Sequence, residues 1–167
     1  MSFSHRVGVA ANIAIIVTCA VLVTFVAVVA RDRVASPPLP NPYQVGNVFA
    51  EVTPATQDTE ALVVVFRTNC RPCRDSADFH RALTKRAVDS GRLRVVAVSA
   101  EPESIVSEYL RTHQIQVSSV LSIDRTQLRV RSTPTLFWLD ASGTIRNMWI
   151  GRLSPEGEQE VLRTLSL

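Results

Sequence analysis

Two cysteines with the spacing of a redox pair, Cys70 and Cys73, follow directly on an apolar run from residue 62 to residue 66. The apolar residues after the pair recur with helical spacing, so the sequence predicts a strand, a tight turn that carries the cysteines, and a helix. If Cys70 starts that helix and Cys73 lies one turn later, both sulfurs share one face and can form a disulfide. The free N–H groups at the helix start favour a thiolate at Cys70, which makes it the expected nucleophile and Cys73 the resolving cysteine.

The two residues between the cysteines are Arg71 and Pro72, and both bear on that chemistry. The guanidinium of Arg71 would stabilise a nearby thiolate electrostatically, although a solvated surface arginine accounts for it equally well. Pro72 fits the first turn of a helix, where its missing N–H removes no hydrogen bond. We therefore expect both residues to tune the reactivity of the pair.

A metal site is the main alternative for a Cys-x-x-Cys pair. Structural zinc needs four ligands, commonly including a second cysteine pair or a pair of histidines. The third cysteine, Cys19, lies far away in a hydrophobic stretch. The histidines show no close pairing: they are His5, His80 and His113. Zinc is therefore the weaker interpretation of the pair. The alternative function is a copper(I)-binding metallochaperone that uses the same two cysteines, with His80, seven residues after Cys73, as a candidate additional ligand.

A second informative stretch begins at Thr133-Pro134 and continues directly into an apolar strand. The turn formers Asp140-Ala141-Ser142-Gly143 follow, and residues 144–153 have the composition of another strand. The sequence thus predicts an antiparallel hairpin over residues 135–153. Taken alone, Thr133-Pro134 would be an ordinary trans proline at a strand start, because only about 5–6% of X–Pro bonds are cis.

Together these features resemble the thioredoxin superfamily and, more narrowly, its membrane-anchored TlpA/ResA-like thiol–disulfide oxidoreductases. The resemblance rests on Asn69-Cys70-Arg71-Pro72-Cys73 after a hydrophobic strand, on Thr133-Pro134-Thr135, on the turn at 140–143 and on Gly151 before the last helix. It covers about residues 45–166 and implies an α/β, thioredoxin-like fold with a central mixed β-sheet flanked by helices. It also implies that Pro134 is cis and packs against the cysteine pair, and that Thr133 offers backbone hydrogen bonds to a substrate peptide.

Two positions depart from the pattern of these proteins. Asn69 stands where the family usually has tryptophan before the first cysteine, and Val64 stands where thioredoxins have a buried acid. The residue that handles the proton at Cys73 is therefore unassigned. Three acids are candidate substitutes, although a solvated surface position explains each of them as well: Asp75, Asp78 and Glu101.

The elements around these motifs are expected to alternate between strands and helices. Buried strands are predicted at 61–66 and 93–99, helices at 71–90 and 102–114, and a short strand or turn at 48–59. The inward faces of the two helices are predicted to be Phe79, Leu83 and Val88, and Ile105, Val106, Tyr109 and Leu110. Gly91 is predicted to stop the first helix, and Ser154-Pro155 to cap a final one. This succession predicts parallel pairing of the first strands with right-handed crossovers.

The N-terminal segment from residue 7 to residue 30 contains no charged residue. As a helix it can span a hydrocarbon core of about 30 Å, and it exceeds the ~7–15 apolar residues of a signal peptide. We expect a short tail at 1–6, an uncleaved transmembrane helix at 7–30, a Pro-rich linker at 31–47 and the redox domain at 48–167. The flanking charges slightly oppose a cytoplasmic N-terminus. The resemblance nonetheless implies a single-pass protein of a bacterial cytoplasmic membrane, with the redox domain on the extracytoplasmic (periplasmic) side.

Residues and resemblance together predict thiol–disulfide exchange on exported proteins. The expected partners are protein disulfides or dithiols and an unidentified redox protein that supplies or accepts electrons, and no organic cofactor is implied. By analogy with the family, the expected direction is reduction, with cytochrome c maturation as a candidate process. The net charge of +3 is mild, so no nucleic-acid partner is expected.

Overall fold

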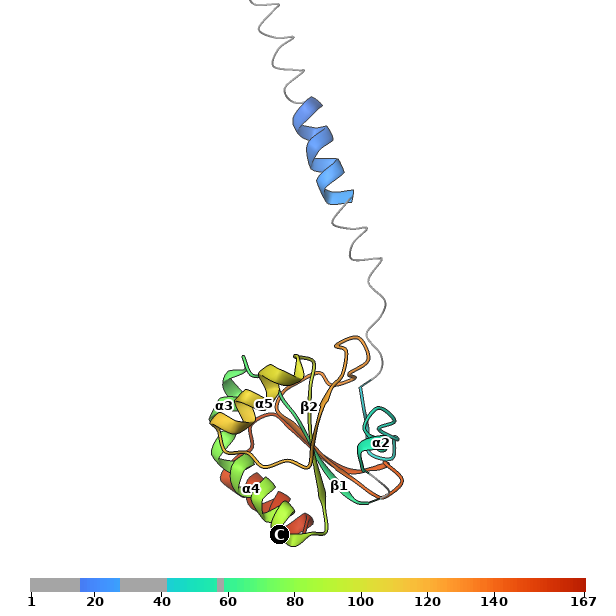
Figure 1. Cartoon of the computed structure of the whole chain (residues 1–167). Helices are drawn as coiled ribbons and strands as arrows, with labels where there is room; N and C mark the ends of the chain where they lie inside the picture. The colour runs from blue at the N-terminus through green and yellow to red at the C-terminus, as the bar shows by residue number, and fades with distance from the viewer. Residues whose placement is uncertain (1–15, 28–41, 57–58) are drawn as a thin grey trace, which may run out of the picture. The chain divides into compact units, whose positions relative to one another are not determined.

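The computed structural model describes residues 16–27, 42–56 and 59–167 (Figure 1). Residues 16–27 form a helix with exposed side chains and belong to a different unit from the compact part of the chain, Pro40–Leu167. Both ends of the predicted transmembrane helix and most of the predicted linker lie outside the described residues. Within the described ranges, no helix combines the length and the apolar character that crossing a membrane requires.

The compact unit is built on a mixed five-stranded sheet in the order β3-β2-β1-β4-β5 (Figure 1). Its strands are β1 (Ala61–Val65), β2 (Arg94–Ser99), β3 (Ser119–Ser122), β4 (Thr135–Leu139) and β5 (Ile145–Ile150). The strands β1, β2 and β3 run parallel to one another, whereas β4 is antiparallel to both β1 and β5. The predicted parallel strands and the predicted hairpin are therefore confirmed.

The central strand, β1, is buried along its whole length. Val63 pairs with Val96 of β2 on one side and with Phe137 of β4 on the other. Because successive side chains of a strand point to opposite faces, Leu62 joins one core cluster and Val63 joins the other. An unbroken apolar run is what such a position requires. The carboxyl ends of the parallel strands share one edge of the sheet, and there the chain leaves β1 toward the cysteine pair.

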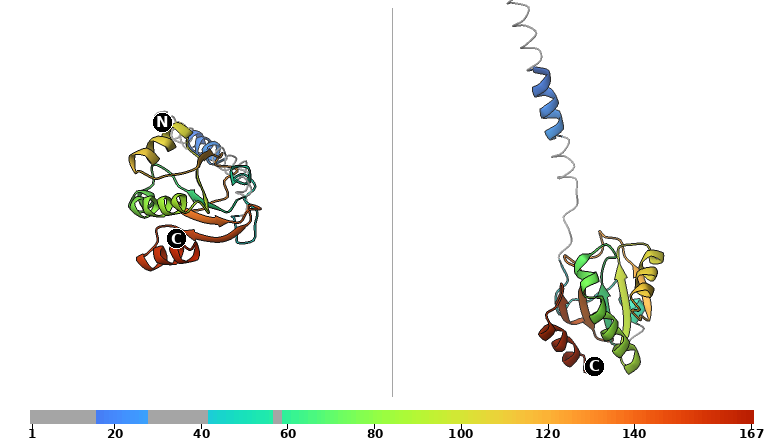
Figure 2. Two further views of the ribbon diagram at one scale, coloured as in Figure 1. Left: turned by 60° about the horizontal axis from the view of Figure 1, so that its bottom comes forward. Right: turned by 90° about the vertical axis from the view of Figure 1, so that its left-hand side faces the viewer.

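Helices and a loop segment cover the two faces of the sheet (Figure 2). Three long helices supply side chains to the cluster that holds Leu62: α4 (Ala77–Ser90), α5 (Glu103–Thr112) and α6 (Pro155–Thr164). Cys73 belongs to the same cluster. The cluster on the opposite face is closed by Tyr43, Phe49 and Val52, which precede the short helix α2 (Thr53–Thr56). The central strands β1, β2 and β4 are therefore buried on both faces, whereas the edge strands β3 and β5 are partly exposed.

The helix predicted at 71–90 is two helices, α3 (Arg71–Asp75) and α4, which Ser76 separates. Ser76 has φ −97° and ψ 1°, and it is both the C-cap of α3 and the N-cap of α4. Serine is a weaker helix former than alanine or leucine, although the hydroxyl of Ser76 makes no capping hydrogen bond here. The helix stop is confirmed, since Gly91 follows α4 in the left-handed conformation with φ 65°.

The predicted inward faces are correct only in part. On α4, Leu83 is fully buried but Val88 is 38% exposed, because a residue five positions further along a helix is rotated off the buried face. On α5, Val106 is buried whereas Ile105 is 50% exposed. The buried residues of α4 are Ala77, His80, Leu83, Thr84 and Ala87. The segment expected to be a short strand or turn contains the helix α2, and Val48 forms an isolated bridge.

Candidate active site

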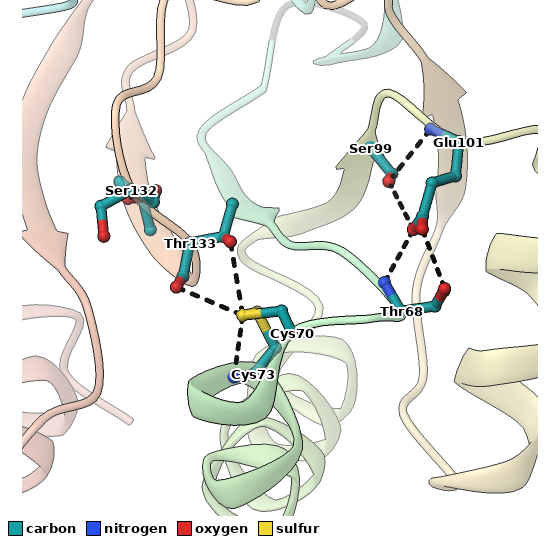
Figure 3. The surroundings of a disulfide bond; sticks show 8 residues. Thr68, Cys70, Cys73, Ser99, Glu101, Ser132 and Thr133 are labelled. Carbon is teal, nitrogen blue, oxygen red and sulfur yellow. Dashed lines mark hydrogen bonds between the residues drawn. A yellow bond between two sulfur atoms is a disulfide. The ribbon is translucent and has the colours of Figure 1, made fainter.

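Cys70 and Cys73 lie where the chain passes from β1 into α3 (Figure 3). Cys70 is the N-cap residue of α3, with an extended backbone (φ −127°, ψ 115°), and Cys73 lies in the first turn. The two residues form a disulfide, with their Cα atoms 5.2 Å apart. Cys73 is fully buried and Cys70 is half-buried, so Cys70 carries the sulfur that a partner molecule reaches first.

The backbone of α3 favours negative charge on Cys70 once the disulfide is opened. The N–H of Cys73 donates a hydrogen bond to Sγ of Cys70 over 3.3 Å, as to a side-chain cap at a helix N-terminus. Hydrogen bonds to a charged group stabilise its charged form, so this contact favours a thiolate over a thiol. Pro72 occupies one of the first two positions of α3, where its missing N–H costs no hydrogen bond.

Arg71 is placed on the solvent side of the helix. Its side chain is 86% exposed, and its Nε lies 4.0 Å from Oδ2 of Asp75. The same carboxylate oxygen is 3.4 Å from Arg152, so two arginines share one acid. Charges this exposed are screened by water and salt, and Arg71 can therefore act on Cys70 only weakly.

The loop before β4 brings Thr133 against Cys70, and the peptide bond between Thr133 and Pro134 is cis, as the resemblance implied. Sγ of Cys70 lies 3.4 Å from the carbonyl oxygen of Thr133 and 3.4 Å from its hydroxyl (Figure 3). A thiol at this position could donate to the carbonyl, and a thiolate could accept from the hydroxyl. Pro134 is buried, and its carbonyl oxygen accepts a hydrogen bond from the N–H of Gly151 over 2.7 Å. That bond ties the loop to the end of β5.

The three candidate acids occupy different surroundings. Asp75 is paired with arginines, as described above, and Asp78 is paired with Arg81 at 2.8 Å while its side chain is 89% exposed. Glu101 instead accepts hydrogen bonds from the backbone N–H and the hydroxyl of Thr68, over 2.7 and 2.9 Å. Of the three, Glu101 is the one bonded to the loop that leads into Cys70.

Sequence reasoning missed the pairing of Thr68 with Glu101. Thr68 follows β1 and Glu101 follows β2. Adjacent parallel strands end at the same edge of the sheet, and this rule could have placed the two residues side by side. The position of the buried acid of thioredoxins is occupied by Val64, which is 2% exposed in an apolar cluster.

His80 is buried in the core and is not exposed for metal binding. It is 4% exposed on the inner face of α4, and burial lowers the pKa of its imidazole to about 4. Cys19, on the separate N-terminal helix, is a free and exposed cysteine. In the part of the chain that the structure describes, no group of three or more histidine, cysteine or acidic side chains is arranged to hold a metal ion.

No family model matches the chain, and no curated protein matches it. Solved structures do, and one of them is a thiol:disulfide interchange protein of the thioredoxin family from Chlorobium tepidum TLS. It is 20% identical, with a TM-score of 0.52 over 77% of this chain and 97% of that one. A thiol-disulfide isomerase from Corynebacterium glutamicum is 17% identical, with a TM-score of 0.52 over 78% of this chain and 96% of that one.

A third similar structure is a DsbF homologue from Corynebacterium diphtheriae, which is 15% identical to this chain. The TM-score is 0.52, and the match covers 66% of this chain and 74% of that one. At such identities the likeness concerns the fold. The mixed sheet with flanking helices, and the neighbours that share it, show that this chain has the thioredoxin-like α/β fold.

Proposed function

We propose that this protein is a thiol–disulfide oxidoreductase that exchanges the Cys70–Cys73 disulfide with disulfides or dithiols of protein substrates. The observation that carries the proposal is the asymmetry of the pair. Cys70 is half-buried and capped by the helix N-terminus, whereas Cys73 is fully buried one turn further on. An accessible sulfur that is stabilised as a thiolate attacks, and a protected neighbour resolves.

In the reducing direction, the thiolate of Cys70 attacks one sulfur of a substrate disulfide. The substrate S–S bond breaks, the second substrate sulfur leaves as a thiolate that takes up a proton, and a mixed disulfide with Cys70 forms. Cys73 then loses its proton and attacks Sγ of Cys70, which releases the first substrate sulfur and forms the Cys70–Cys73 disulfide. The released first substrate sulfur takes up the second proton. Because Cys70 gave up its own proton when its thiolate formed, the substrate gains two electrons and two protons overall, and the dithiol form of the protein loses them. The oxidising direction is the exact reverse of these steps.

The carbonyl of Thr133 supports a role in substrate binding. It lies 3.4 Å from Sγ of Cys70, so a substrate backbone that brings its sulfur to Cys70 would pass beside it. The three similar structures are named as a thiol:disulfide interchange protein, a thiol-disulfide isomerase and a DsbF homologue. Disulfide interchange and disulfide isomerisation, the reactions in the first two names, both proceed by attack of a thiolate on a disulfide.

We further propose a direction for the redox reaction and a location for the domain. The family resemblance favours reduction of exported proteins, with cytochrome c maturation as one process that needs it, and a redox protein as electron donor. The uncharged stretch at 7–30 supports a membrane anchor. The family resemblance, and not the charges that flank this stretch, favours the periplasmic side of a bacterial cytoplasmic membrane for the domain. Labelling an introduced exposed cysteine with a membrane-impermeant thiol reagent in intact cells tests this placement, and labelling only after lysis would contradict it.

A trapping experiment with insulin, a protein disulfide substrate, tests the exchange itself. In the reduced full-length protein, Cys73→Ser should accumulate a mixed disulfide through Cys70, because no resolving thiol remains. Cys70→Ser is the matched control and should trap nothing. If Cys73→Ser traps no insulin and the wild type does not reduce it, the proposal fails. Stoichiometric binding of copper(I) by a protein inactive in exchange would instead favour a metallochaperone.

A further inference from the structure

The carboxylate of Glu101 joins the loop that carries Cys70 to the end of β2. Glu101 follows that strand by two residues, and Figure 3 shows its side chain reaching toward Thr68. The N–H of Thr68 donates to one carboxylate oxygen over 2.7 Å, and the hydroxyl of Thr68 donates to the other over 2.9 Å. The hydroxyl of Ser99 donates to the first oxygen over 3.3 Å. Hydrogen bonds to an ionised acceptor are stronger than those between neutral groups.

Glu101 is itself held in place by two strands. Ser99 is fully buried, and its hydroxyl also accepts the N–H of Glu101 over 3.3 Å. Ser122, the last residue of β3, donates its hydroxyl to the carbonyl oxygen of Glu101 over 2.9 Å. Hydrogen bonds to the ends of β2 and β3 therefore hold Glu101 in place.

The loop between β1 and α3 needs such a support. The N–H of Phe66 still bonds to the carbonyl oxygen of Val98 over 3.1 Å, so the ladder with β2 extends to that residue. Beyond it the chain turns out of the sheet, and Cys70 must arrive with the extended backbone of an N-cap residue. Thr68 lies halfway along this turn, and its two bonds to Glu101 set the path.

We propose that Glu101 is a positioning residue for Cys70. Through Thr68 it holds residues 67–69 so that Sγ of Cys70 lies at once within reach of the N–H of Cys73 and of Thr133. The role rests on the proposed function, because it matters only if Cys70 reacts as a thiolate. Glu101 thereby takes a role other than the proton handling for which acids near the pair were considered.

A positioning role and an electrostatic role of Glu101 predict opposite effects on the rate at which Cys70 reacts. A negative charge near Cys70 disfavours a thiolate, so an electrostatic role means that removing the charge speeds the reaction of Cys70. A positioning role means that removing the hydrogen bonds loosens the cap and slows it. Glutamine separates the two, because it carries no charge yet its amide oxygen can still accept from the N–H of Thr68 while its NH2 donates to the hydroxyl of Thr68.

The test measures the alkylation of reduced full-length protein by iodoacetamide across a range of pH. Fragmentation of the peptide that contains both Cys70 and Cys73 in the mass spectrometer assigns the modification to one of the two sulfurs and separates it from that of Cys19. In Glu101→Ala the rate at about pH 6 should fall about two- to five-fold, which is the size of a helix-terminal contribution to a charge, and the pH midpoint should rise. Glu101→Gln should stay close to the wild type. Glu103→Ala, which removes a neighbouring exposed acid, is the matched control and should leave the rate unchanged.

Faster alkylation in both Glu101→Ala and Glu101→Gln would overturn the positioning role in favour of a charge effect. An unchanged rate in Glu101→Ala would overturn it outright. If Glu101→Ala does not fold, Thr68→Val removes one of the bonds and should slow Cys70 in the same direction, and an unchanged rate there counts against the role. A wild-type Cys70 with an ordinary thiol midpoint, near about 8.5, would instead contradict the proposed function.

Discussion

Burial of His80 couples the stability of the domain to pH. The side chain is 4% exposed among the core residues of α4, and burial lowers its pKa from 6.5 to about 4, since the charged imidazole would lose its water. The unfolded chain exposes His80 and restores the ordinary pKa. Protons therefore bind more readily to the unfolded chain, and acid favours unfolding.

The size of this effect follows from the two pKa values. Above about pH 6.5, His80 is neutral in both states, and its contribution to the free energy of unfolding does not change with pH. Between about pH 6.5 and about pH 4, the unfolded chain binds a proton that the folded chain does not, so the free energy of unfolding falls. At ~1.4 kcal/mol per pKa unit, the loss amounts to about 2 kcal/mol at about pH 5 and about 3 kcal/mol in full.

Urea unfolding at about pH 7 and about pH 5, followed by the fluorescence of Trp138 and Trp149, measures this loss. His80→Leu cannot titrate, so the wild type should lose about 2 kcal/mol more than this variant between the two conditions. The difference between variants cancels the contribution of the acidic residues. His113→Gln, which changes the half-exposed histidine that follows α5, should behave like the wild type. Equal pH dependence in wild type and His80→Leu would refute the reasoning.

Two further substitutions test the surroundings of the pair and the fold. Arg71→Gln should slow alkylation of Cys70 by less than about two-fold at low ionic strength, and salt should abolish the difference, because the charge is exposed. A difference that survives in salt would mean direct contact. Gly143→Ala should lower the free energy of unfolding by about 1–3 kcal/mol, because Gly143 has φ +79° and a new Cβ would strike the side chain of Thr53. Gly46→Ala shares the positive φ but has nothing within 4 Å of a new Cβ, so equal urea midpoints for the two variants would contradict this.

The strands β1 and β2 could be predicted because each contains an uninterrupted apolar run. Residues 61–66 have no polar face, so they indicate a strand buried on both sides, and β1 lies at the centre of the sheet. The hairpin could be predicted from its turn formers. The break at Ser76 could not, because a single serine inside a helical pattern is common and only the packing decides whether it caps a helix.

At the site, local sequence predicted the cysteine pair and its order along the helix. The cis bond before Pro134 could not be predicted from its neighbours, since most X–Pro bonds are trans, and only the resemblance implied it. The contact of Thr68 with Glu101 joins residues that follow two different strands, so no local pattern marks it. Contacts between residues of different elements can be predicted only when the strand order is known.

The most direct test of the account is the redox equilibrium of Cys70 and Cys73 in the full-length protein, measured in buffers of defined thiol–disulfide ratio. If the two cysteines exchange electrons with protein partners, this disulfide should open and re-form reversibly, with one midpoint that is lost in Cys70→Ser and in Cys73→Ser. A midpoint of about −270 mV would support reduction of substrates, and one of about −120 mV would support oxidation. A pair that forms no reversible internal disulfide would contradict the account.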